Sequence, residues 1–107
     1  MTRGVLTAVA ALLILATPVA SEQHRAALVE EGRAAFTRIG CSNCHSVRGV
    51  GAAMAPDLSK VGMKHDIAYL ERWLRDPREL RPSGHMPALE LTDADIRALA
   101  AYLAVQR

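Results

Sequence analysis

The pentapeptide "CSNCH", Cys41 to His45, holds both cysteines of the 107-residue chain and places a histidine directly after the second one. Four kinds of chemistry use two thiols at this spacing: a disulfide, a zinc site, a thiol redox couple and the covalent attachment of a haem. Residues three and four apart share one face of a helical turn, so Cys41, Cys44 and His45 can all address one flat group. Two thioethers would then hold a haem by its vinyl groups while the histidine reaches the iron.

The zinc site and the thiol redox couple need a context that the sequence does not offer. A zinc site needs four ligands, and the remaining histidines, His24, His65 and His85, supply no second ligand pair at motif spacing. A thioredoxin-like couple follows a strand in a βαβ fold, which the helical pattern of this chain does not predict. A disulfide forms in an exported chain unless something else claims the thiols. The motif therefore favours a covalently attached haem.

The first residues indicate export. A short cationic head ending at Arg3 precedes an apolar run from Gly4 to Ala20, and the chain turns polar at Ser21. This layout is typical of a secretory signal peptide. We predict a signal peptide over residues 1–21, cleaved near Ala20 or Ser21, and a mature domain over residues 22–107 in the periplasm. The alternative is an uncleaved membrane anchor, because the apolar run reaches the lower length limit of a membrane span.

Composition and charge limit what the mature domain can do. It is near the size at which a polypeptide core alone gives marginal stability. Only 4% of the residues of the whole chain are aromatic, so a rigid apolar cofactor would complete the core. Loss of Arg3 with the signal lowers the formal net charge from +2 to +1. Neither a nucleic-acid binder nor a polybasic membrane binder is indicated.

The pattern of apolar residues predicts an all-α fold. Helices are expected over residues 22–39 and 65–75, and a third is expected after Thr92, which has the side chain of an N-cap. The glycine-rich segment 49–62 has the composition of a loop, and residues 76–89 contain too many prolines and glycines for a regular element. No segment shows the alternation of a strand.

The loop before the last helix offers two candidates for the second axial position of a haem iron. They are His85 and Met86 in "GHMPAL". We predict Met86, because a proline-bounded loop suits a ligand that must be held at a set distance. Adjacent residues of an extended loop point apart, so His85 is expected to be exposed. His/Met ligation favours ferrous iron and raises the reduction potential.

These residues resemble the class I, mono-haem cytochromes c of the bacterial periplasmic type. The resemblance covers the mature chain and rests on four motifs in order: "CSNCH", "APDL", "WLRDPRELRPSGHMPAL" and "LTDADIRALAAYL". It implies the small cytochrome c fold, with three to five short helices around one haem c that two thioethers hold. It also implies that Gly32 and Phe36 of the first helix pack against Tyr102 of the last.

The resemblance further implies roles for individual site residues. Cys41 and Cys44 would carry the thioethers, and His45 and Met86 would be the proximal and distal iron ligands. The backbone carbonyl of Pro56 would bind the other ring nitrogen of His45, which orients the ring and makes it a better donor. Trp73 would reach a haem propionate through its indole N–H, with ordinary packing as the alternative.

The expected function is one-electron transfer between redox proteins, such as a respiratory oxidase, reductase or dehydrogenase. The alternative is a haem subunit within such a complex, and a haem enzyme or gas sensor is less favoured because it needs an open iron position and a pocket with donors. We expect no enzymatic activity, a monomer, and membrane contact only through docking or a retained N-terminal segment. Residues 38–81 carry eight basic and five acidic side chains, which predicts a modestly positive haem face.

Overall fold

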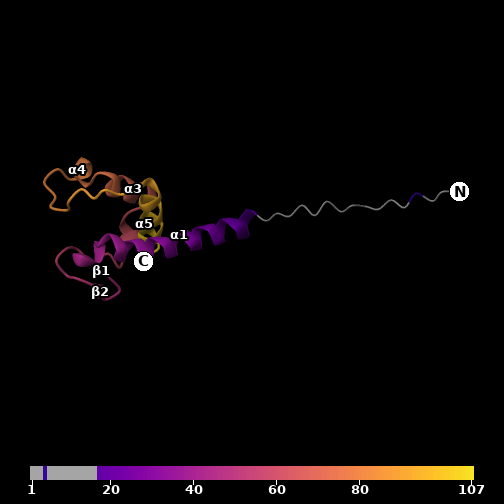
Figure 1. Cartoon of the computed structure of the whole chain (residues 1–107), viewed down its shortest axis with the longest axis horizontal. Coiled ribbons are helices and arrows are strands. Elements are labelled where there is room, and N and C mark those ends of the chain that lie inside the picture. Colours follow the sequence, from indigo (N-terminus) through magenta and orange to yellow (C-terminus); the bar gives the residue numbers. More distant parts are fainter. Residues whose placement is uncertain (1–3, 5–16) are drawn as a thin grey trace.

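The computed structural model describes Gly4 and residues 17–107 (Figure 1). Its elements confirm the predicted all-α class, with one short hairpin added. In chain order they are α1 (Thr17–Ile39), the 3₁₀ turn η1 (Cys41–Asn43), β1 (Ser46–Val47), β2 (Val50–Gly51), α2 (Val61–Lys64), α3 (Ile67–Arg75), α4 (Pro77–Leu80) and α5 (Asp93–Ala104). Most of the expected signal segment lies outside the described residues.

Helix α1 packs across α5, and one glycine permits their close approach. A Cβ atom on Gly32 would overlap the carbonyl oxygen of Ala98, so no larger residue fits this crossing. One turn further along α1, the rings of Phe36 and Tyr102 pack at a tilt with their centroids 5.7 Å apart. The contact that the resemblance implied is therefore present. Helix α1 begins at Thr17 rather than residue 22, since Pro18 lies in its first turn, where proline is tolerated.

The last helix has the cap that the sequence predicted. The Thr92 hydroxyl accepts a hydrogen bond from the Asp95 backbone N–H, and the Asp95 carboxylate accepts one from the Thr92 N–H, which together form a capping box. The apolar face of α5 forms the centre of the core, where Leu99 is fully buried. The core consists of Ala35, Phe36, Val47, Leu70, Leu74, Ile96, Leu99, Ala100 and Leu103.

The segment after the "CSNCH" motif forms a two-residue hairpin, which the sequence analysis did not predict. Strands β1 and β2 pair antiparallel, with Val47 opposite Val50. The two residues between them, Arg48 and Gly49, have φ angles of 51° and 80°. Positive φ at both central positions is the geometry that matches the twist of a hairpin. Arginine at the first of these positions is not a turn signal, which explains why the hairpin was missed.

The middle of the chain is divided into shorter helices than the sequence suggested. The predicted helix over 65–75 begins at Ile67, because the Asp66 carboxylate accepts a hydrogen bond from the Tyr69 N–H and caps α3. The expectation that residues 76–89 hold no regular element is wrong for one turn, α4. Asp76 caps this turn, and Pro77 occupies its first position, where a missing N–H costs nothing.

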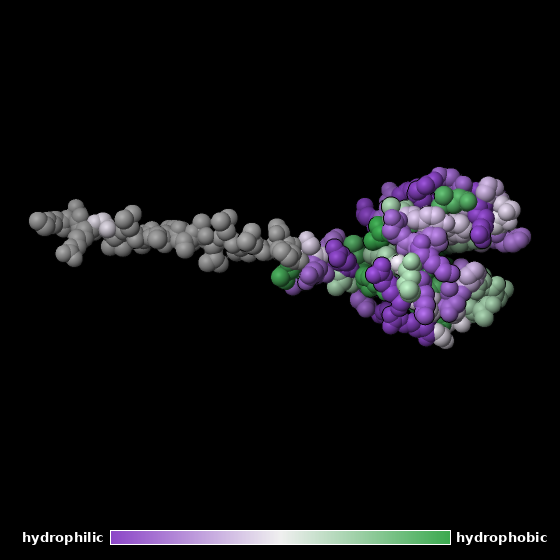
Figure 2. Space-filling view, turned by 180° about the vertical axis from the view of Figure 1, so that it is seen from behind, coloured by the Kyte–Doolittle hydropathy of each residue, from purple (hydrophilic) through white to green (hydrophobic). Residues whose placement is uncertain are grey.

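The folded part divides into two halves joined by α5. One half contains α3, α4 and the long loop that follows, and the other contains η1 and the hairpin (Figure 1). Figure 2 shows a notch between these halves on the side away from the N-terminal end of α1. Among the described residues, no helix is long and apolar enough to span a membrane.

Candidate functional site

The "CSNCH" residues lie on one tight turn at the end of α1. Gly40 starts this turn with a φ of 97°, a conformation that L side chains rarely adopt. Cys41 then accepts two backbone hydrogen bonds at its carbonyl, from Cys44 at 3.2 Å and from His45 at 2.9 Å. The two cysteines and the histidine therefore lie on one hydrogen-bonded turn, as their spacing predicted.

Both thiols of the motif are free. Cys41 is half-buried and Cys44 is exposed. Burial raises the pKa of the Cys41 thiol, which is the reverse of what a thiolate redox couple or a zinc ligand needs. Within Gly4 and residues 17–107, no cluster of three or more His, Cys, Asp or Glu side chains could hold a metal ion.

A backbone carbonyl fixes the ring of His45. Nδ1 of the half-buried imidazole lies 2.7 Å from the carbonyl oxygen of Pro56. A carbonyl only accepts, so Nδ1 donates to it, and Nε2 is the ring nitrogen that remains available to a metal. A histidine whose other nitrogen is held in this way has a fixed orientation and is a stronger ligand.

The segment that carries Pro56 is itself tied to the motif turn. Three backbone N–H groups of this segment donate to carbonyls of residues 42–46. The bonds run from Ala52 to Ser42 at 3.0 Å, from Ala55 to Cys44 at 2.8 Å and from Leu58 to Ser46 at 2.8 Å. The "APDL" segment therefore lies alongside "CSNCH".

The loop between α4 and α5 separates the two candidate distal ligands by exposure. His85 is exposed, and Met86 is half-buried, as the alternation of an extended loop predicted. The indole Nε1–H of Trp73 donates to the Met86 sulfur at 3.1 Å. This contact was not anticipated from the sequence, because nothing in the spacing of residues 73 and 86 signals that their side chains meet.

The two sets of donors lie on opposite sides of the notch. Met86 belongs to the half formed by α3, α4 and the following loop, and Cys41, Cys44 and His45 belong to the half formed by η1 and the hairpin (Figure 1). A flat apolar group attached at the motif turn can therefore reach both halves. The residues present fit a haem bound between them.

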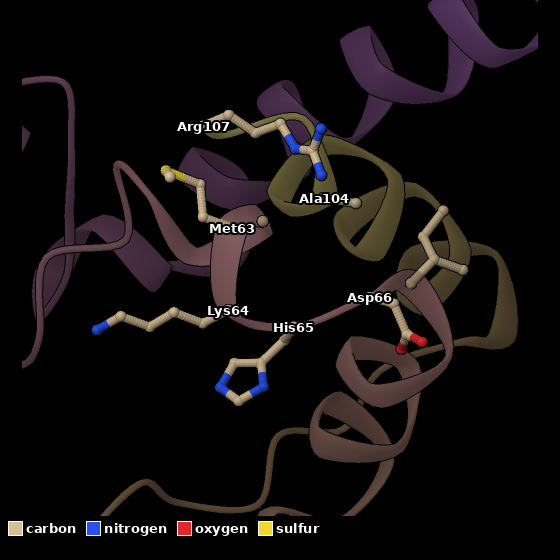
Figure 3. Close-up of a pocket in the computed structure, with 8 residues that line it drawn as sticks. Met63, Lys64, His65, Asp66, Ala104 and Arg107 are labelled. Atoms are coloured by element: carbon tan, nitrogen blue, oxygen red, sulfur yellow. The ribbon is translucent and has the colours of Figure 1, made fainter.

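A separate cavity of about 520 Å³ lies beside α2 and the end of α5. Figure 3 shows Met63, Lys64 and His65 along its side, with Ala104 and Arg107 from the end of the chain. The imidazole of His65 stacks on the ring of Tyr69, with 3.9 Å between the two ring centroids. No lining residue comes from the "CSNCH" motif or from the Met86 loop, so this cavity is distinct from the candidate site.

Comparisons with known proteins agree with this arrangement. Cytochrome c oxidase subunit 2 of Alkalihalophilus pseudofirmus is 35% identical over 91 residues, which cover 77% of this chain and 27% of that protein. A nitric oxide reductase subunit of Paracoccus denitrificans is 32% identical over 96 residues, which cover 81% of this chain and 64% of that protein. The chain thus spans less than two thirds of the length of either relative.

The sequence model of the Cytochrome c family matches residues 29–106. That range includes the motif turn, the Pro56 segment, the Met86 loop and α5. The chain therefore belongs to the cytochrome c family, whose members carry a covalently bound c-type haem and transfer electrons.

Proposed function

We propose that this protein is a one-electron carrier whose haem c is joined to Cys41 and Cys44 and ligated by His45 and Met86. The observation that carries the proposal is the His45 ring, held by Pro56 on the same turn as the two thiols. When bound, the haem supplies a reversible exchange between ferric and ferrous iron. The role of the chain is to attach, orient and shield it.

Each residue of the site has a separate part in that role. The two cysteines hold the group without needing a closed pocket, which suits a small domain. His45 offers Nε2 to the iron, because its Nδ1 is occupied by the hydrogen bond to the Pro56 carbonyl. Met86 offers a soft sulfur that favours the ferrous state. With both axial positions filled by the chain, no position stays open for a substrate, which supports a carrier and not an enzyme.

Substitution of the two neighbouring loop residues tests the ligand assignment. In Met86→Ala, the ferric holoprotein should lose the weak sulfur-to-iron charge-transfer band at the red end of the visible spectrum. It should also bind added imidazole or cyanide. His85→Ala is the matched control and should keep the band, because His85 is exposed. Loss of the native low-spin spectrum in His85→Ala, with that spectrum retained in Met86→Ala, would reverse the assignment.

We further propose that the chain is exported to the periplasm by its N-terminal segment. The support is the cationic head and the apolar run up to Ala20. Mass spectrometry of the protein from a periplasmic extract should find an N-terminus near Ser21 or Glu22. A full-length chain that stays with the membrane fraction would instead indicate that the segment is kept as an anchor.

A second candidate is a haem subunit that remains within a larger redox complex. The similarity to an oxidase subunit and to a nitric oxide reductase subunit favours it, since both relatives are named as parts of complexes. The two candidates differ in what accompanies the protein after purification from its native host. A free carrier elutes alone at the mass of one chain, whereas a subunit of a complex elutes with catalytic partners in fixed stoichiometry.

A further inference from the structure

Gln106 is the single buried polar or charged residue among those that the structure describes, and 5% of its surface is exposed. It lies two residues beyond α5. Its backbone N–H donates to the Leu103 carbonyl at 3.1 Å, and its backbone carbonyl accepts from the Gly62 N–H at 2.9 Å. Its side chain donates to the Tyr102 carbonyl at 3.0 Å and accepts from Nε of Arg48 at 3.2 Å. Gln106 therefore connects three parts of the fold: α5, α2 and the hairpin.

The side-chain amide of Gln106 is matched to its two partners. Nε of Arg48 can only donate and the Tyr102 carbonyl can only accept, so the side chain must supply one acceptor and one donor. A glutamate would supply acceptors alone, and a leucine would supply neither. Of the two side-chain bonds, the one from Arg48 leaves α5 and reaches the turn between β1 and β2.

The hairpin turn needs support at Arg48. Its φ of 51° lies in the left-handed region, which is unfavourable for a residue that has a Cβ. Two hydrogen bonds hold it there. The Arg48 backbone N–H donates to the Ser59 hydroxyl at 2.7 Å, and the Arg48 side chain donates to Gln106. The turn is thus tied on one side to the segment that follows Pro56 and on the other side to the end of α5.

Gly62 brings the far end of the Pro56 segment to the same place. It belongs to α2, which follows that segment, and its N–H is the donor to the Gln106 carbonyl. A Cβ atom on Gly62 would overlap the carbonyl oxygen of Ala104, so the backbone of α2 lies directly against the end of α5. The position of the Pro56 segment is therefore set from Gln106 as well.

We propose that Gln106 is a positioning residue for the proximal ligand: it fixes the hydrogen bond between His45 and Pro56 by holding the chain on both sides of that bond. Arg48 lies three residues after His45, and Gly62 lies six residues after Pro56. A shift of either segment relative to Gln106 changes the distance between the ring and the carbonyl. The proposal rests on ligation of the haem iron by His45, as proposed above.

The first readout is the balance between the two oxidation states. The hydrogen bond from His45 makes the ring a stronger donor, which favours ferric iron. Gln106→Leu removes both side-chain bonds and keeps the apolar bulk, the backbone bonds and the charge of Arg48. At a fixed ambient potential, the ratio of ferric to ferrous protein should therefore fall by up to about fivefold in this variant, the equivalent of one ordinary hydrogen bond.

The second readout is the exchange of the His45 Nδ1 proton with deuterated water in the reduced holoprotein. The ring current of the haem shifts the signals of an iron-bound histidine and so identifies them. A hydrogen-bonded proton exchanges slowly, so its exchange rate should rise severalfold in Gln106→Leu. Gln106→Glu keeps an acceptor for Arg48 and should restore a rate near that of the wild type.

Thr92→Ala is the matched control, because it removes the cap at the opposite end of α5 and destabilises the fold without a contact to Gln106. It should leave both readouts unchanged. Arg48→Met breaks the same bond from its exposed partner and keeps the backbone bond to Ser59. It should raise the exchange rate as Gln106→Leu does, and it tests the proposal even where Gln106→Leu yields no holoprotein. The double variant should exchange no faster than the faster single variant, since both changes remove one bond.

Four results would overturn the proposal, and one of them also removes the proposed ligand. An unchanged exchange rate in Gln106→Leu or in Arg48→Met, while the His45 signals are shifted as for a bound ring, removes the role of Gln106 alone. An equal rise in Thr92→Ala would reduce that role to general stability, and a Gln106→Glu protein that exchanges as fast as Gln106→Leu would remove the bond to Arg48 as its cause. A reduced wild type without ring-current-shifted signals from His45 would remove His45 as the ligand as well.

Discussion

The substitution Gly32→Ala tests how α1 and α5 are packed around the haem motif. The added Cβ would overlap the Ala98 carbonyl oxygen and lie 2.5 Å from the Tyr102 Cβ, whereas an ordinary contact is 3.4–4 Å. The nearest atom belongs to the backbone, so no side-chain rotation relieves the clash. The helices must move apart, and the tilted packing of Phe36 on Tyr102 is then lost as well.

The expected cost follows from two opposing effects. Overpacking a core costs about 1–3 kcal/mol, and a backbone clash of this size belongs at the upper end of that range. Alanine in place of glycine inside a helix returns about 1 kcal/mol. The net loss in the free energy of unfolding is therefore about 2 kcal/mol. In a domain of this size, each 1 kcal/mol corresponds to about 4–8 °C in the melting temperature.

The assay is denaturation of the holoprotein, followed by far-ultraviolet circular dichroism. Ala34→Ser is the control, because Ala34 lies in the same helix and is exposed. It should change the free energy of unfolding by no more than about 0.5 kcal/mol. A Gly32→Ala protein as stable as the wild type, or more stable through its better helix propensity, would show that the described crossing of α1 and α5 is wrong.

Two further predictions concern charge. The Arg38 guanidinium and the hydroxyl and N–H groups of Thr92 hold the pKa of Asp95 below its ordinary value. The ionised carboxylate therefore stabilises the fold at any pH above the pKa that Asp95 has in the unfolded chain. This stabilisation is lost as the pH falls through the lower pKa of the folded protein. Denaturant midpoints measured down to strongly acidic pH should fall less steeply in Asp95→Asn; an equally steep fall would contradict this. The rate of electron transfer to an acidic partner should fall severalfold as the salt concentration rises, since charges are screened beyond about 8 Å at physiological salt. The charge reversal Lys64→Glu should lower this rate more than Arg97→Glu does. A rate that salt does not change would indicate an apolar docking patch.

Local signals in the sequence predicted most of the fold. Thr92 and Asp95 specify the start of α5 through bonds between residues three apart, and the pattern of apolar residues then sets which face is buried. The same holds for the motif turn, where the spacing of Cys41, Cys44 and His45 is the geometry of the turn itself. Such features need no knowledge of the rest of the chain, which is why the sequence alone indicates them.

The sequence does not predict features that depend on contacts between distant segments of the chain. Arg48 adopts a positive φ that its residue type does not signal, so the sequence predicts a loop where the structure has a hairpin. The prolines and glycine of residues 76–89 predict no regular element, although Pro77, directly after the Asp76 cap, is a favourable first residue of a helix. The pairing of Trp73 with Met86 depends on how α3 and the loop pack, and no spacing along the chain encodes it.

Covalent attachment of the haem is tested most directly by the mass of the mature protein after extraction with acidified acetone, followed by denaturation. Because Cys41 and Cys44 are proposed to hold the haem by thioethers, the denatured wild-type chain should retain the mass of one haem. Cys41→Ala and Cys44→Ala should each give a sharply lower yield of holoprotein. A wild-type chain that releases its haem intact into the acetone phase would contradict the central claim.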